Sequence, residues 1–243
     1  MSFARFRQRT FAEINLLRRA AVATAGRFFW LIPIVVPIIW LTANEFLLTI
    51  RLFLETVGVR EIQNRLLGLP LVVIAIFLGL RIVAGEINAR TLEIVYTVPG
   101  GASRVWTTKL LAAAAILLST EVIMAVYLWF RFGPFPIEAM YGAFQCAIFF
   151  LVISMGFSAL FRSEVSGAIV SCALLFLFGV FSGFGHTQHI WSPFFNPYAD
   201  SFLSDTSVLV NILRNRIGFA IVIGILVWLA FLRGERREKL LGG

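Results

Sequence analysis

Residues 140–185 read MYGAFQCAIFFLVISMGFSALFRSEVSGAIVSCALLFLFGVFSGFG, which is two apolar runs separated by the turn Arg162-Ser163-Glu164. The first run, 140–161, has 22 residues, the second, 165–185, has 21, and neither contains a charged side chain. About 20 apolar residues of helix are needed to cross a bilayer core that is about 30 Å thick. The stretch therefore predicts a hairpin of two transmembrane helices.

The composition of the whole chain agrees with a membrane protein. Of the 243 residues, 59% are hydrophobic and only 14% are charged, and the mean hydropathy is +0.89. A soluble domain has roughly half apolar and a quarter charged residues, so a globule of this size could not cover so much apolar side chain. These values exclude a soluble enzyme, a soluble nucleic-acid binder and a disordered chain.

Four further apolar runs have the length of a span or come close to it. They lie at about 28–48, 66–83, 110–130 and 217–232. Together with the hairpin they predict an all-α polytopic protein with six transmembrane helices.

The basic residues predict how these helices are oriented. Of the 21 lysines and arginines, 15 lie in or beside the segments 1–27, 84–108, 162–164 and 233–243, and the other six lie in the alternate loops. Because basic residues accumulate on the cytoplasmic side, both termini are predicted to be cytoplasmic. The net charge of +8 thus reflects membrane orientation and does not indicate nucleic-acid binding.

The N-terminal segment 1–27 has an amphipathic pattern. At helical spacing Phe3, Phe11 and Leu17 share one side, while Arg5 and Arg9 lie opposite. This pattern predicts a helix lying in the cytoplasmic interface of the membrane. The alternative is an unstructured basic tail that only sets the topology.

The longest predicted cytoplasmic loop, 84–108, connects the second and third spans. Leu92, Val95 and Tyr96 recur at helical spacing, and Pro99 ends the pattern. A short helix here would present Arg90, Thr91 and Glu93 to the cytosol and could dock a soluble partner. The alternative is a solvated loop that only links two spans.

Glu121 is the one acidic residue deep within a predicted span. A charge at the centre of a bilayer costs about 2.5–3.5 kcal/mol on insertion scales, so this side chain should face protein or a water-filled cavity. If the protein moves a solute across the membrane, Glu121 is a candidate for the translocation path. The alternative is a structural bond to Ser119, Thr120 or a neighbouring helix.

The predicted outer loop, 186–212, is rich in aromatic residues, including Trp191, Phe194 and Phe195. Such a loop either returns partly into the membrane or forms an aromatic belt at the interface. His186 and His189 are too few ligands for a zinc centre, and we predict no metal site and no catalytic residue in the chain.

The segment between the second and third spans resembles that of the ABC-2 type transporter permeases. In that family an acid, four residues and Thr-Leu-Glu are followed by a proline eight residues after the threonine and a lysine ten residues after the proline. Here the corresponding residues are Glu86, Thr91-Leu92-Glu93, Pro99 and Lys109. The family also has six spans with both termini inside, and a proline and an aromatic before the last span, similar to Asn196-Pro197-Tyr198 here.

This resemblance implies that residues 1–243 form one ABC-2 type transmembrane domain, the membrane half of an ATP-driven exporter in the plasma (inner) membrane of a prokaryote. No Gly-x4-Gly-Lys-Ser/Thr pattern occurs in the chain, so ATP and Mg²⁺ are expected in a separate ATP-binding subunit. A second copy of the permease, or a related one, would complete the translocation path within the bilayer. The ATPase-coupling residues implied are Glu86, Arg90, Thr91, Leu92, Glu93, Val95, Pro99 and Arg104.

Two other functions remain open from the sequence. A secondary transporter could move protons through Glu121, although we find no internal repeat of the kind that such carriers contain. An intramembrane enzyme would need paired acids or histidine clusters within the spans, whereas Glu121 stands alone at depth.

Overall fold

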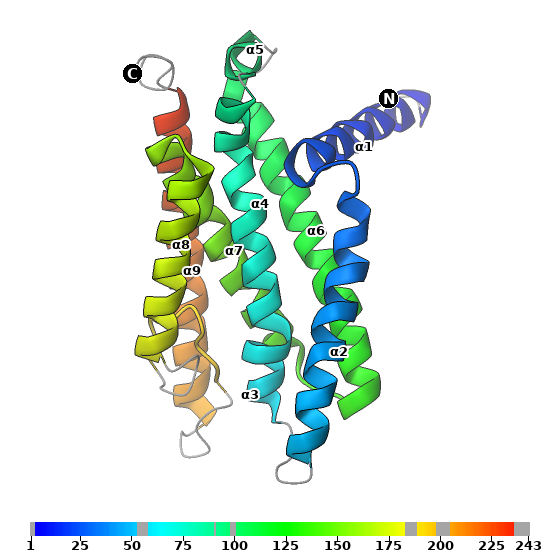
Figure 1. Ribbon diagram of the computed structural model, residues 1–243, viewed down its shortest axis with the longest axis vertical. Coiled ribbons are helices and arrows are strands. Elements are labelled where there is room, and N and C mark those ends of the chain that lie inside the picture. The colour runs from blue at the N-terminus through cyan, green and yellow to red at the C-terminus, as the bar shows by residue number, and fades with distance from the viewer. Residues whose placement is uncertain are drawn as a thin grey trace.

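The computed structural model describes residues 3–52, 58–89, 91–97, 101–182, 189–197 and 205–235. Every regular element within these ranges is a helix, which confirms the all-helical class expected from the sequence. The helices run side by side in an elongated bundle (Figure 1).

The centre of the bundle is a single continuous helix from Val59 to Asn88. It comprises α3 (Val59–Glu61), the π-helical segment η2 (Ile62–Gly68) and α4 (Leu69–Asn88). In the most apolar stretch of 18 residues in this helix, 78% is buried inside the protein. The corresponding share is 17% for α8 (Glu164–Ser182) and 22% for the last helix of the chain. The central helix is therefore covered by protein, whereas α8 presents most of its apolar surface to the surroundings.

The central helix packs against α7 (Ile137–Phe161) through small residues. At Gly79 a Cβ atom would overlap the Ser154 hydroxyl oxygen and the Leu151 carbonyl oxygen. Helix α8 approaches α7 in the same way, because a Cβ atom added at Gly167 of α8 would lie 2.8 Å from the Ser158 Cα atom of α7. Close approach through small residues is the usual way in which helices associate within a membrane.

The remaining long helices are α2 (Ile32–Leu52), α6 (Gly101–Phe132) and α9 (Asp205–Glu235). Large apolar side chains are exposed on all three, for example Ile39 (64%), Phe130 (86%) and Trp228 (61%). A soluble protein rarely exposes so much contiguous apolar surface, so the chain is a multi-pass, membrane-embedded protein.

Three helices extend well beyond the apolar runs that predicted them. The central helix Val59–Asn88 exceeds the run 66–83 at both of its ends. α6 begins at Gly101, within the expected cytoplasmic segment 84–108, and α9 begins at Asp205, within the expected outer loop 186–212. The apolar run marks only the part of a helix that matches the bilayer, whereas the backbone hydrogen bonds continue into polar residues beyond it.

The N-terminal helix α1 (Phe3–Ala25) does not continue straight into α2. The segments Glu13–Ala25 and Phe29–Glu45 are inclined at 84°, and the turn between them contains Gly26 at φ +88°, a conformation that glycine adopts without strain. The short helix η1 (Phe29–Leu31) follows this turn. Within the described residues, five helices are long and apolar enough to cross a membrane, and the bent pair raises the number to six if it forms one span.

The two ends of the bundle differ. Helix α1, the short helix α5 (Leu92–Thr97) and the last turn of α9 lie at one end, called the α5 end below (Figure 1). Helix α3 and the segment 189–197 lie at the other end, called the loop end.

Candidate functional site

Three polar residues from separate elements meet at the α5 end. Lys109 of α6 forms an ion pair with Glu86 of α4, and the Thr91 hydroxyl donates a hydrogen bond to the other carboxylate oxygen of Glu86. The side chains of Lys109 and Glu86 are only 4% and 14% exposed. The Lys109 ammonium also donates to the carbonyl oxygen of Ile82 at 3.4 Å. Either charge alone would be costly to bury, so the ion pair favours an arrangement in which α4 and α6 meet at these two residues.

The local chain explains how Thr91 reaches Glu86. Thr91 directly precedes α5, and its carbonyl oxygen accepts a hydrogen bond from the Val95 amide at 3.2 Å, so it caps that helix. Its own amide donates to the Glu86 carbonyl oxygen at 3.0 Å. Thr91 is half-buried, and its hydroxyl and its amide both tie α5 to the end of α4.

Helix α5 has one side turned to the bundle and one turned outward. Val95 is 6% exposed and belongs to the main apolar core, and Tyr96 packs against that core. Glu93 and Thr97 are exposed, as is Arg104 in the first turn of α6. Of the other expected coupling residues, Leu92 lies in α5, and Arg90 and Pro99 fall outside the described residues.

A groove of about 510 Å³ lies beside this cluster, between α1 and the start of α6. Leu16 and Arg19 line it from α1, and Arg104 and Thr108 line it from α6, with Glu86 and Lys109 between them. The ion pair thus forms part of a concave surface that several helices build.

Glu121 lies on the inner side of α6, 12 residues or about 18 Å along the helix from Lys109. Its side chain is 1% exposed, and its Oε1 atom has no hydrogen-bond partner within the described part of the chain. The hydroxyls of Ser119 and Thr120 each donate to the Ile116 carbonyl oxygen, at 2.8 Å. The expected orientation toward protein is therefore present, whereas the two neighbouring hydroxyls bond to their own helix.

Sequence reasoning missed a buried polar cluster at the loop end. The Arg216 guanidinium of α9 donates to the Gln145 side-chain oxygen of α7 at 3.0 Å, and the Gln145 amide donates to the Arg216 carbonyl oxygen at 2.7 Å. Gln63 of η2 and Asn215 of α9 complete the cluster, and all four side chains are at most 8% exposed. An amide within an apolar run, as at Gln145, was the available signal.

This cluster holds the segment 189–197 against the bundle. The Gln63 amide donates to the Phe195 carbonyl oxygen at 3.0 Å, and the Asn215 amide donates to the carbonyl oxygens of Ile190 and Ser192 at 2.6 and 3.0 Å. Asn196 and Pro197 are buried, whereas Tyr198 and His186 lie outside the described residues. The segment is therefore packed on the helices.

Replacing Gln63 with leucine is expected to loosen this segment, because the Phe195 carbonyl would lose its partner and a buried hydrogen bond is worth about 1 kcal/mol. Hydrogen exchange by mass spectrometry would measure it: the Ser192 and Phe195 amides, bonded at 2.9 and 3.1 Å, should exchange several-fold faster. Val73→Leu, on the exposed side of the same helix, should leave them protected. Equal protection in both variants would contradict the role given to Gln63.

No protein-family model, curated protein or solved structure matches this chain.

Proposed function

We propose that this chain is the membrane-spanning permease subunit of an ABC-2 type exporter, coupled to a separate ATP-binding subunit that hydrolyses ATP with Mg²⁺. Two such chains, or this chain and a related permease, would form the translocation path at their interface. The α5 end would face the cytoplasm and bear on the ATPase.

The observation that carries the proposal is the meeting of Glu86, Thr91 and Lys109. These are the acid, the threonine and the lysine through which the sequence resembles the permease family, and they are spread over 24 positions of the chain. Their contacts fasten α5 to α4 and, through the same Glu86 side chain, α4 to α6. A helix fixed in this way would transmit a push from a docked partner to two membrane-spanning helices as a rigid body.

The outward side of α5 supports docking of a soluble partner. Glu93 and Thr97 are exposed there, while Val95 anchors the helix from the inner side. Arg104 is exposed at the start of α6, so charges of both signs lie on this end of the protein. Electrostatic complementarity of such a surface would select a partner and orient it.

The remaining geometry fits a cytoplasmic α5 end. Helix α1 is inclined at 84° to the helix that follows, and it exposes Ile14 (56%) and Leu16 (44%). An amphipathic helix in this position would lie along the membrane surface. Helix α1 and the last turn of α9 lie at the same end (Figure 1), as an even number of membrane crossings requires. Most basic residues of the sequence belong to segments predicted to lie on that side.

The proposal is tested by purifying the tagged chain from its native membrane in mild detergent, with mass spectrometry and an ATPase assay on the proteins that co-purify. We expect a stoichiometric P-loop ATPase. Glu93→Arg should lower its recovery at least about tenfold, which corresponds to about 1.4 kcal/mol, because the change reverses a charge on the docking surface.

Glu138→Arg is the matched control, since Glu138 is also exposed but lies in the first turn of α7, next to the loop end. Its recovery of ATPase should equal that of the unaltered chain. An equal loss in both variants, or a chain that purifies alone and without ATPase activity, would contradict the proposal.

A proton-coupled secondary transporter is the second candidate, and the isolation of Glu121 favours it. Its Oε1 atom is buried without a partner within the described residues, as a proton-binding carboxylate in a transport path can be. Proteoliposomes that contain the chain would then take up substrate when a proton gradient is applied without ATP. Loss of this uptake in the Glu121→Gln variant would support this function over the first.

A further inference from the structure

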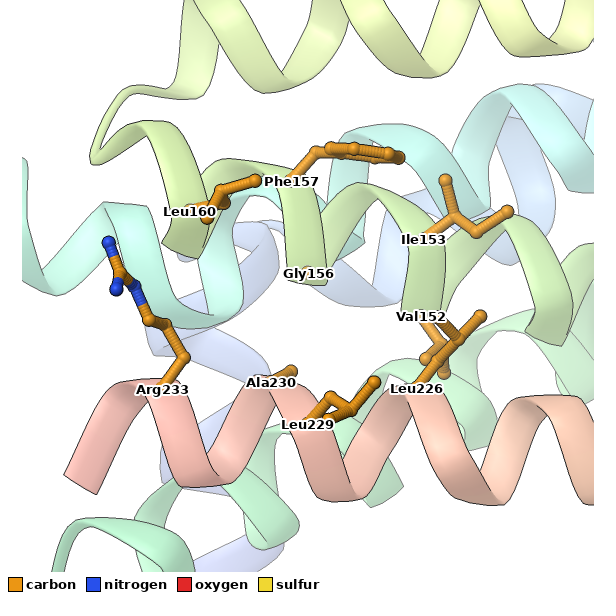
Figure 2. Close-up of a pocket in the computed structure, with 9 residues that line it drawn as sticks. All are labelled: Val152, Ile153, Gly156, Phe157, Leu160, Leu226, Leu229, Ala230 and Arg233. Atoms are coloured by element: carbon orange, nitrogen blue, oxygen red, sulfur yellow. The ribbon is translucent and has the colours of Figure 1, made fainter. Parts of the chain in front are cut away.

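A narrow groove of about 290 Å³ opens between α7 and α9 (Figure 2). Its walls are apolar side chains, among them Val152, Phe157 and Leu160 of α7 and Leu226 and Leu229 of α9. It lies along two helices that cross the membrane, so apolar molecules of the bilayer have direct access to it.

Among the described residues that line the groove, Arg233 is the one that carries a charge, and it lies at one end. Figure 2 shows the Arg233 side chain extending from α9 toward the end of α7 near Leu160. Its Nε atom is buried and has no hydrogen-bond partner within the part of the chain that is described. A guanidinium offers several donors in a planar fork that fits a phosphate group, and near a helix end it can reach the headgroup region of a membrane.

Gly156 keeps the groove open. It lies on the wall formed by α7, and a Cβ atom added to it would have no other atom within 4 Å. The space is therefore not filled by any side chain at this position. A side chain at this position would therefore begin in the open groove and not against the backbone of a neighbouring helix.

The lining of the groove indicates its occupant. Apolar side chains of α7 and α9 form its walls, and a charged side chain lies at one end. An extended hydrocarbon chain can pack along such walls. An apolar slot that ends in one cation is complementary to a molecule with an apolar chain and an anionic head.

We propose that the groove between α7 and α9 binds one acyl chain of an anionic phospholipid, whose phosphate is held by Arg233. Such a site needs neither an ATPase nor a second copy of the chain, so it stands independently of the transport function proposed above. The bound lipid would fill the gap between two membrane-spanning helices that Gly156 leaves open.

Native mass spectrometry of the full-length chain, released from detergent micelles with defined lipids, tests this proposal. The probes are phosphatidylglycerol and phosphatidylcholine with identical acyl chains. The unaltered chain should retain one phosphatidylglycerol molecule, with an apparent affinity about tenfold above that for phosphatidylcholine. Arg233→Gln should abolish this preference, and Arg233→Lys should restore part of it because the positive charge returns.

The apolar part of the site is tested with two glycines. Gly156→Leu should lower phosphatidylglycerol retention at least about fivefold, because the side chain occupies the groove. Gly224→Leu is the matched control: a Cβ atom there also has open space, but Gly224 is not among the residues that line the groove. Far-ultraviolet circular dichroism of both variants should match that of the unaltered chain.

Three results would overturn the proposal. Equal retention in the Gly156→Leu and Gly224→Leu variants would show that the lipid adheres elsewhere. Equal affinity of the unaltered chain for the two lipids would remove the role given to Arg233. A dimer mass that appears as the lipid is lost, and that Gly156→Leu abolishes, would show that a second copy covers the groove.

Discussion

Replacing Lys109 with methionine is expected to destabilise the protein by about 3–5 kcal/mol, the usual cost of removing one partner from a buried ion pair. The Glu86 carboxylate, 14% exposed, would keep the hydrogen bond from the Thr91 hydroxyl but would lose its ion pair with Lys109. Thermal unfolding in detergent, followed by circular dichroism, measures the loss. Because Glu86 connects α4 to α5, hydrogen exchange in α5 should also increase more than exchange in α7.

The double variant Glu86→Gln with Lys109→Met separates the charge from the packing. It should recover most of the lost stability, because no unpaired charge remains and the methionine keeps a chain of similar length. Lys109→Arg, which retains the charge, should be closer to the unaltered protein than Lys109→Met. A single Lys109→Met variant as stable as the unaltered chain would mean that the ion pair does not hold this end together.

Replacing Gly79 with alanine is expected to destabilise the bundle by about 3 kcal/mol or more, at or above the upper end of the usual range for overpacking. The added methyl group would overlap the Ser154 hydroxyl oxygen and the Leu151 backbone oxygen. A side chain can rotate away, but the carbonyl oxygen belongs to a helical backbone and cannot move independently. The central helix would therefore have to separate from α7.

Gly85→Ala is the control, because it adds the same methyl group to the same helix. Its nearest neighbours would be Glu164 Oε1 at 3.6 Å and Arg81 Cβ at 3.7 Å, which are ordinary contacts. Denaturation of the two variants in detergent, and their yield as monodisperse protein, should differ clearly, with Gly85→Ala close to the unaltered chain. Equal stability of the two variants would show that α4 and α7 are farther apart at Gly79 than the structure has them.

The sequence was sufficient to predict a helical membrane protein, because this fold class depends on the hydropathy of short continuous segments. A helix in a membrane satisfies its backbone hydrogen bonds within itself, so an apolar run of about 20 residues is enough to indicate one. This is why the runs 140–161 and 165–185 correspond closely to α7 and α8. The ends of α6 and α9 were not predictable in this way, since those helices continue past their apolar runs.

The candidate site was predictable only as a segment. The spacing of Glu86, Thr91 and Lys109 drew attention to the region, but it did not indicate that the three side chains meet or that Thr91 turns inward. The cluster of Gln63, Gln145, Asn215 and Arg216 was missed because its members come from three separate helices. The sequence placed Arg216 only among the six basic residues of the alternate loops.

By itself, the sequence determined that this chain is helical and embedded in a membrane, because hydropathy adds up residue by residue along the chain. Only the tertiary structure decided which polar groups are paired, which glycines mark a helix crossing and where a groove stays open. Those features depend on the rotation and separation of neighbouring helices, set by contacts such as Gly79 with Leu151 that join residues 72 positions apart.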